Sequence, residues 1–168
     1  MKRIVIALMA AIAIPFCAMA QDKFGHINSQ EILQIMPERQ AAESQLDTLA
    51  SQYENEMSKM TEEYYSKIQD YQKNESTMTD PIKQARQSEL AEMEQRIQNF
   101  RTQASQEIQK QQSVLFSPIV QKVQNAIVSV GDKNGFTYIF DTASQAIVYQ
   151  SAKAIDVTSL VKAELGLK

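Results

Sequence analysis

The side chains with the clearest capacity for chemistry are Met and Tyr residues that recur along one stretch of the chain. Between residues 46 and 71, the larger apolar residues are separated by 3, 4, 4, 3, 4, 4 and 3 positions. This spacing places them on one face of a helix. The members of this stripe are Leu46, Leu49, Tyr53, Met57, Met60, Tyr64, Ile68 and Tyr71. Thioether and phenol groups offer polarisable, weakly specific contacts, so the stripe favours non-covalent binding or packing over bond-making chemistry.

The groups that enzymes and metal sites need are scarce. The 168 residues include one His and one Cys, too few for a zinc site or a His-based triad. No glycine lies between Gly25 and Gly131, which excludes a Gly-rich phosphate loop in that stretch. His26 falls in a predicted strand, and the acidic residues lie on solvated helix faces without a pocket to perturb them. We therefore expect no enzyme activity, no metal and no cofactor.

The stripe belongs to a long helix that needs a partner. Residues from Pro37 to about Asn74 contain strong helix formers and no internal breaker. The polar segment 74–81 predicts a turn, and a second apolar 3/4 pattern from Ile82 predicts a helix that returns and ends at Gly131 and Gly135. The sequence therefore predicts an antiparallel helical hairpin, an arm over residues 38–112 with its tip near 74–81.

Reflecting the two apolar stripes about the turn predicts which residues meet. Met60 falls near Met93 or Ile97, and Leu46 falls near Ile108. The simplest interpretation of the Met and Tyr stripe is this packing seam. Adjacent residues on a helix point 100° apart, so Tyr64 and Tyr65 cannot both lie in the seam. At least one of the two is available to another molecule.

The two ends of the chain predict a small body, formed by residues 21–37 and 113–168. Short strands are expected at 23–28, 136–141 and 146–150, with the last two forming a hairpin, and a final helix starts at Asp156 or Thr158. Asn28 with Glu31 predicts a capping box at the start of a brief helix. The expected body core and oligomer contacts are Phe24, Ile27, Phe136, Tyr138, Phe140, Ile147 and Tyr149.

The predicted fold class is α+β and mostly helical. Apolar edge strands invite pairing with another chain. A small body carrying so long an arm is expected to oligomerise, with the strands of several copies closing into a shared barrel.

The first 20 residues have the pattern of a cleaved signal peptide. Lys2 and Arg3 precede an apolar run over residues 4–16, and Ala18-Met19-Ala20 provides a small-x-small cleavage site. The run is shorter than the roughly 20 residues of a membrane-spanning helix. A membrane anchor and a lipid-modified Cys17 are the weaker alternatives. Cleavage after Ala20 predicts export without stable membrane insertion, and leaves a chain of charge −5 that lacks Cys. An acidic chain of this kind is not typical of nucleic-acid binders.

The mature chain resembles the Skp/OmpH family of periplasmic chaperones. The resemblance rests on the segment FGHINSQEILQIMPE, the Gln-rich hairpin and the ending GFTYIFDTASQAIVYQSAKAIDVTSLVKAEL. It implies a homotrimer whose strands form a barrel and whose arms enclose a cavity. It also implies a periplasmic, ATP-independent holdase for unfolded outer-membrane proteins. The well-known members are strongly basic and bind lipopolysaccharide, whereas this chain is acidic, so no lipopolysaccharide site is carried over.

A holding chaperone needs many weak contacts, because its client stays unfolded. The client-facing groups are expected to be among Tyr53, Met57, Met60, Tyr64, Tyr65, Tyr71, Met93 and Phe100. The alternative function is that of a structural envelope coiled coil, or an adaptor that docks one specific partner. A chaperone should recover many outer-membrane proteins in a pull-down, whereas an adaptor should recover one dominant partner.

Overall fold

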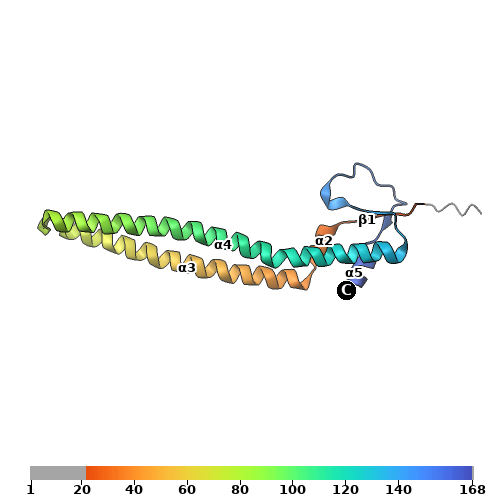
Figure 1. Cartoon of the computed structure of the whole chain (residues 1–168), viewed down its shortest axis with the longest axis horizontal. Helices are drawn as coiled ribbons and strands as arrows, with labels where there is room; N and C mark the ends of the chain where they lie inside the picture. Colours follow the sequence, from red (N-terminus) through yellow and green to blue (C-terminus); the bar gives the residue numbers. More distant parts are fainter. Residues whose placement is uncertain (1–21, 168) are drawn as a thin grey trace, which may run out of the picture.

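The computed structural model describes residues 22–167. A two-helix arm projects from a body to which both ends of the described chain contribute (Figure 1). This architecture confirms the predicted α+β class, a long helical hairpin on a small strand-containing body. The predicted signal peptide lies outside the described residues.

The body begins with strand β1 (Phe24–Ile27), which leads into helix α2 (Ser29–Gln34). The Asn28 side chain accepts hydrogen bonds from the backbone N–H groups of Gln30 and Glu31, at 3.2 and 3.3 Å. Its amide donates to the Glu31 carboxylate at 2.8 Å. The Asn28 oxygen satisfies backbone N–H groups that the first turn leaves free, which confirms Asn28 as the cap. Glu31 accepts from the side-chain amide of Asn28 rather than from its backbone N–H, so the predicted box forms only in part.

The arm consists of helix α3 (Pro37–Asn74) and the first part of helix α4 (Asp80–Asn134). A short 3₁₀ turn, η1 (Glu75–Thr77), connects the two helices at the tip. Pro37 and Pro81 each lie in the first turn of a helix, where the missing N–H would have had no partner. At about 1.5 Å per residue, the 38 residues of α3 extend the arm roughly 57 Å.

The two helices meet in the predicted register. Met60, Met93 and Ile97 line one small cavity across the hairpin. Leu46 lines a second cavity together with Glu107 and Gln111 of α4. These two residues lie one position before and three positions after Ile108, the partner predicted for Leu46. The hairpin alignment deduced from the apolar spacing is thus confirmed.

Helix α4 passes beyond the arm and becomes the backbone of the body. It contains Pro118, and Figure 1 shows it bending in its teal part, which includes that residue. It also continues through Gly131, which was predicted to end it, because a helix-interior glycine costs only about 1 kcal/mol where packing supports the helix. Gly135 ends the helix with a φ of 66°, a left-handed conformation that favours glycine.

The sheet is parallel, in the order β2-β1-β3, with β2 (Tyr138–Asp141) and β3 (Ile155–Asp156) on either side of β1. The predicted hairpin of 136–141 with 146–150 is therefore wrong. Because β2 and β3 both run parallel to β1, the chain must return across the sheet between them. Residues 146–150 are part of that return and form no strand, and the third strand follows them.

The core lies where β1, α2 and the final helix α5 (Thr158–Glu164) pack on the end of α4. Its most completely buried side chains are Ile27, Ile32, Met36, Val157 and Val161. Gly25 is needed here for close approach, since a Cβ at this position would lie 3.0 Å from both the Phe136 ring and Val157. The body therefore has a continuous hydrophobic core that contains few fully buried side chains.

Candidate interaction surfaces

Most of the predicted client-facing residues lie in the seam of the arm. Met93 is buried, with 6% of its surface exposed, and six others are half-buried. Tyr53 on α3 and Phe100 on α4 pack edge to face, with ring centroids 5.8 Å apart. The six half-buried residues are Tyr53, Met57, Met60, Tyr64, Tyr71 and Phe100. The stripe consequently holds the hairpin together and offers only its edges to another molecule.

Tyr65 is the exception among the eight candidates. Its side chain is 59% exposed, and its ring centroid lies 5.8 Å from that of Tyr64. This confirms the prediction that one of the two adjacent tyrosines lies outside the seam. Tyr65 is thus a large aromatic group that the fold of the single chain leaves available for binding.

Polar groups lock the outer half of the hairpin. Lys67 on α3 forms an ion pair with Glu89 on α4, and Arg86 also reaches Glu89, at 2.8 Å. The hydrogen bond from Lys67 is the largest cause that lowers the pKa of Glu89. Nearer the tip, Gln87 donates to the Tyr71 hydroxyl at 2.8 Å, and that hydroxyl donates to Glu75. Tyr71 therefore has a structural role that the sequence pattern did not reveal.

The base of the arm carries a groove that sequence reasoning missed. Two adjoining hollows of about 320 and 350 Å³ lie between α3 and α4, and Gln45 and Leu115 line both. We call them together the base groove. Its other main walls are Ala41, Ala42, Leu46, Leu49, Pro118 and Ile119. The adjacent Ala41 and Ala42, which lie across the groove from Pro118, could have indicated it. Small side chains leave space between two packed helices.

In the body, the predicted residues divide into two groups. Ile27 is buried, and Phe136 is half-buried against the core, with the Lys23 ammonium 4.1 Å from its ring centroid. Phe24, Tyr138 and Phe140 instead stand exposed on one face of the sheet, with ring centroids 5.9–6.3 Å apart. The sheet thus presents a row of stacked aromatic rings that the single chain does not cover.

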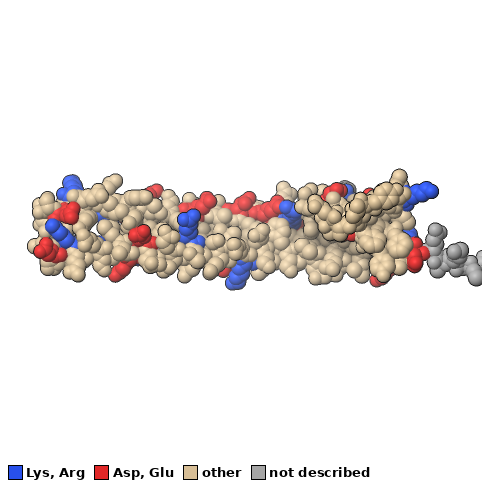
Figure 2. Space-filling view, turned by 90° about the horizontal axis from the view of Figure 1, so that it is seen from above, with Lys and Arg blue, Asp and Glu red and all other residues tan. Residues whose placement is uncertain are grey.

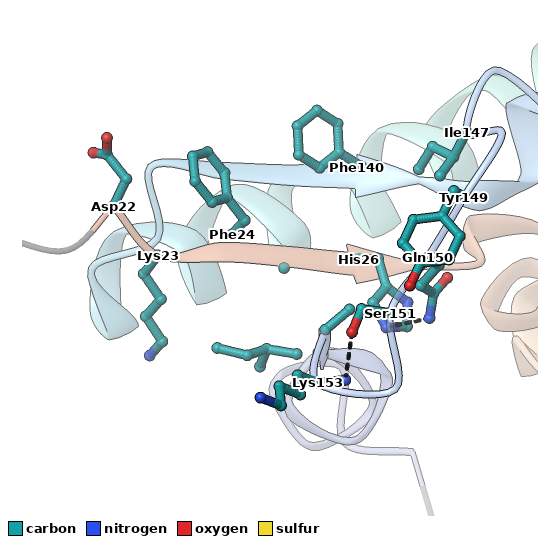
Figure 3. A pocket seen from close by; sticks show the side chains of 13 residues that line it. Asp22, Lys23, Phe24, His26, Phe140, Ile147, Tyr149, Gln150, Ser151 and Lys153 are labelled. Carbon is teal, nitrogen blue, oxygen red and sulfur yellow. Dashed lines mark hydrogen bonds between the residues drawn. The ribbon is translucent and has the colours of Figure 1, made fainter.

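The segment that crosses from β2 to β3 borders a cavity of about 670 Å³ beside these rings (Figure 3). Ile147 and Tyr149 lie along its wall with Phe24 and Phe140. The His26 Nε2 atom and the Gln150 amide nitrogen are 2.8 Å apart and hold this segment beside β1. Tyr149 is nevertheless 82% exposed, and neighbouring Val148 is 100% exposed.

The sheet also has an open edge. Among the described residues, β2 is hydrogen-bonded to β1 alone, so the backbone groups on its outer side face away from the sheet. An unpaired edge beside exposed aromatic rings is a template for another strand. The body therefore offers both main-chain and side-chain contacts to a further polypeptide.

Charged side chains are spread along the arm without a concentration of one sign on the face shown in Figure 2. Figure 2 shows residues of both signs along the arm, separated by wide uncharged stretches, on the face seen from above. Within residues 22–167, no three His, Cys, Asp or Glu side chains gather as metal ligands would. No helix in the same range is long and apolar enough to cross a bilayer.

These features define a class of α+β proteins in which a long helical arm projects from a small body with an open sheet. Comparison with known proteins gives the particular group. The family model described as "Outer membrane protein (OmpH-like)" matches residues 23–165, and the chain belongs to this family. The resemblance deduced from the sequence is confirmed, and the family agrees with the expectation that the chain is not an enzyme.

Curated relatives match over nearly their whole length. The Chaperone protein Skp of Photorhabdus laumondii is 27% identical over 164 residues, which cover 96% of this chain and 98% of the relative. The protein of the same name from Pectobacterium atrosepticum is 28% identical over 143 residues, 83% of each chain. A solved OmpH-like outer membrane chaperone from Caulobacter crescentus superposes with a TM-score of 0.74 at 16% identity, covering 87% of this chain and 85% of its own. That structure supports the fold.

Proposed function

We propose that this protein is a periplasmic holdase chaperone that binds unfolded outer-membrane proteins and prevents their aggregation without ATP. The observation that carries the proposal is the architecture itself, a roughly 57 Å helical arm on a small body with an open, aromatic-faced sheet. Such an arm buries few of its own side chains and leaves long polar and weakly apolar surfaces free. These are the surfaces that an unfolded chain can contact at many points while it keeps its conformational entropy.

Holding a client in a sheltered space requires more than one arm, and we propose that three copies assemble through their bodies. The outer edge of β2 lacks a partner among the described residues. The β-branched and aromatic segment 146–150 has strand-forming residues but pairs with no strand among residues 22–167. Pairing this segment with the β2 edge of a neighbouring copy would extend the sheet and bring side chains of that copy beside the rings of Tyr138 and Phe140. Repetition of the contact around a three-fold axis would close a barrel and leave no free edge.

The proposed location follows from the first 20 residues, read as a signal peptide cleaved after Ala20. A chain exported in this way would meet outer-membrane proteins while they are still unfolded. It would also work where no ATP is available, and binding by many weak contacts requires none.

The function is tested by diluting a urea-unfolded outer-membrane β-barrel protein into buffer with and without the purified chain. Light scattering follows the aggregation of the diluted client. We expect suppression at near-stoichiometric amounts and no effect of added ATP. Aggregation at an unchanged rate would contradict the proposal. Recovery of one dominant folded partner from periplasmic extract, in place of many outer-membrane proteins, would favour the adaptor alternative.

A further inference from the structure

Two methionines and an arginine share one small hollow in the seam of the arm. Met60 of α3 lines it with Met93 and Arg96 of α4, and Glu63 and Ile97 complete its walls. The volume of the hollow is about 40 Å³. A water molecule needs only roughly 10–15 Å³ of such space. The hollow therefore has room for one more oxygen atom beside the thioether groups.

The described chain carries its oxidisable sulfur in Met alone. The single Cys of the sequence, Cys17, lies outside residues 22–167. Oxidants convert a thioether to a sulfoxide, and a Met side chain that solvent can reach reacts first. Met60 is half-buried, whereas Met93 keeps only 6% of its surface exposed. Of the two sulfurs at the hollow, Met60 is therefore the one that an oxidant in solution can reach.

Arg96 places hydrogen-bond donors at the same hollow. Its side chain is exposed and forms no ion pair with any residue from 22 to 167, including Glu63, the other charged residue there. A guanidinium group has five N–H donors, and a thioether sulfur is only a weak acceptor for them. A sulfoxide oxygen carries partial negative charge and is a strong acceptor. Oxidation of Met60 would thus create, within the seam, an acceptor that suits Arg96.

We propose that Met60 is an oxidation site and that Arg96 binds the sulfoxide formed there. A peroxide, such as hydrogen peroxide, transfers one oxygen atom to the Met60 sulfur. The S–O bond forms as the O–O bond breaks, the sulfur loses two electrons, and the peroxide is reduced to water. An N–H of Arg96 then donates to the sulfoxide oxygen. The arm accepts oxidation at this point while α3 and α4 stay packed, whether or not the chain acts as a holdase.

Met57 provides the comparison for a sulfur without this partner. It is half-buried like Met60 and lies three positions earlier on α3, but it does not line the hollow that contains Arg96. A sulfoxide without a hydrogen-bond donor between two packed helices is unfavourable, because a polar group then loses its contact with water. We therefore expect oxidation of Met57 to weaken the hairpin, and oxidation of Met60 to weaken it much less.

Two variants of the full chain that each retain one half-buried Met within residues 22–167 test this difference. The first combines Met57→Leu with Met78→Leu and keeps Met60, and the second combines Met60→Leu with Met78→Leu and keeps Met57. Each is treated with hydrogen peroxide, and peptide mass spectrometry locates the added oxygen. Urea unfolding followed by circular dichroism, at one fixed protein concentration, gives the unfolding constant before and after treatment. We expect oxidation to raise this constant about tenfold more in the second variant than in the first.

Removing the guanidinium group isolates its contribution. In the variant that keeps Met60, adding Arg96→Ala should increase the effect of oxidation on the unfolding constant about tenfold. Arg101→Ala is the matched control, because Arg101 is also exposed on α4 and forms no ion pair in residues 22–167, but does not line the hollow. It should change the effect of oxidation by less than about twofold.

Three results would overturn the proposal. The first is an equal effect of oxidation on the variants that keep Met60 and Met57. The second is an equal influence of Arg96→Ala and Arg101→Ala on the oxidised chain. The third is oxidation of Met93 as fast as that of Met60, because the seam would then be open before the oxidant acts.

Discussion

Asp141 illustrates how single residues join distant parts of the body. Its carboxylate accepts hydrogen bonds from the backbone N–H of Ser29 at 3.1 Å and that of Ala143 at 3.0 Å. It also accepts one from the Ser29 hydroxyl. Burial alone would raise the pKa of Asp141, but these three donors together hold it below its usual value. One side chain thus connects the end of β2 to the start of α2.

The lowered pKa of Asp141 makes stability depend on pH in a definite direction. Because the folded pKa lies below the unfolded one, the ionised carboxylate stabilises the fold fully above the unfolded value of about 3.9. This contribution is lost as the pH falls through the folded pKa. Asp141→Asn should lower the free energy of unfolding at pH 7 by about 1–2 kcal/mol. It should also flatten the loss of stability on acidification.

Urea unfolding between about pH 7 and pH 3, followed by circular dichroism, measures both effects. Asp47→Asn is the matched control, since Asp47 is exposed and makes no hydrogen bond or ion pair in residues 22–167 through its side chain. Its stability should stay within about 0.5 kcal/mol of the parent at every pH. An Asp141→Asn profile that runs parallel to the parent's would show that the carboxylate contributes nothing.

At the scale of elements, the hairpin could be predicted because its information is local. The 3/4 spacing from Leu46 to Tyr71 defines one face of α3, and a polar turn fixes where the partner face begins. Register then follows by reflection, and Met60 does meet Met93 and Ile97. No long-range pairing has to be guessed for such a structure.

The sheet was harder to predict because its pairings are not local. Residues 146–150 have the composition of a strand, but composition does not specify a partner. The parallel pairing of β1 with β2 joins Phe24 to Tyr138, more than a hundred positions apart. The base groove was not predicted for a similar reason. Its volume depends on the combined sizes of facing side chains from α3 and α4, which are far apart in the sequence.

The two kinds of tyrosine on α3 give a prediction at this scale. Tyr65→Ser should leave stability within about 0.5 kcal/mol of the parent, because the side chain is largely exposed. Tyr53→Ser removes the ring that packs on Phe100, and should reduce the free energy of unfolding by about 1–3 kcal/mol. Urea unfolding monitored by helical circular dichroism separates the two variants.

If Tyr65 contacts clients, Tyr65→Ser should also weaken suppression of client aggregation while helicity is unchanged. Exposed Ser58, at another position on α3, provides the control Ser58→Ala, which removes no aromatic surface. Undiminished suppression by Tyr65→Ser would remove this residue from the client-binding surface.

At the scale of the whole molecule, the arm and the body differ in what stabilises them and in which apolar groups they leave exposed. The arm is held by a single seam and a few polar bridges, such as Lys67 to Glu89, and leaves most of its surface in water. The body has a thin core and exposes Phe24, Tyr138 and Phe140 on its sheet. Covering these rings with a second and third copy would stabilise the body and gather the arms around one space. The proposed holdase function requires this assembly.

The most direct test is multi-angle light scattering of the purified chain at micromolar concentration, alone and after mixing with a urea-unfolded outer-membrane barrel protein. A trimeric holdase should have the mass of three copies when alone, and should form a soluble complex whose mass is greater by that of one client. A folded chain with the mass of a single copy, together with a client that still aggregates, would contradict this prediction.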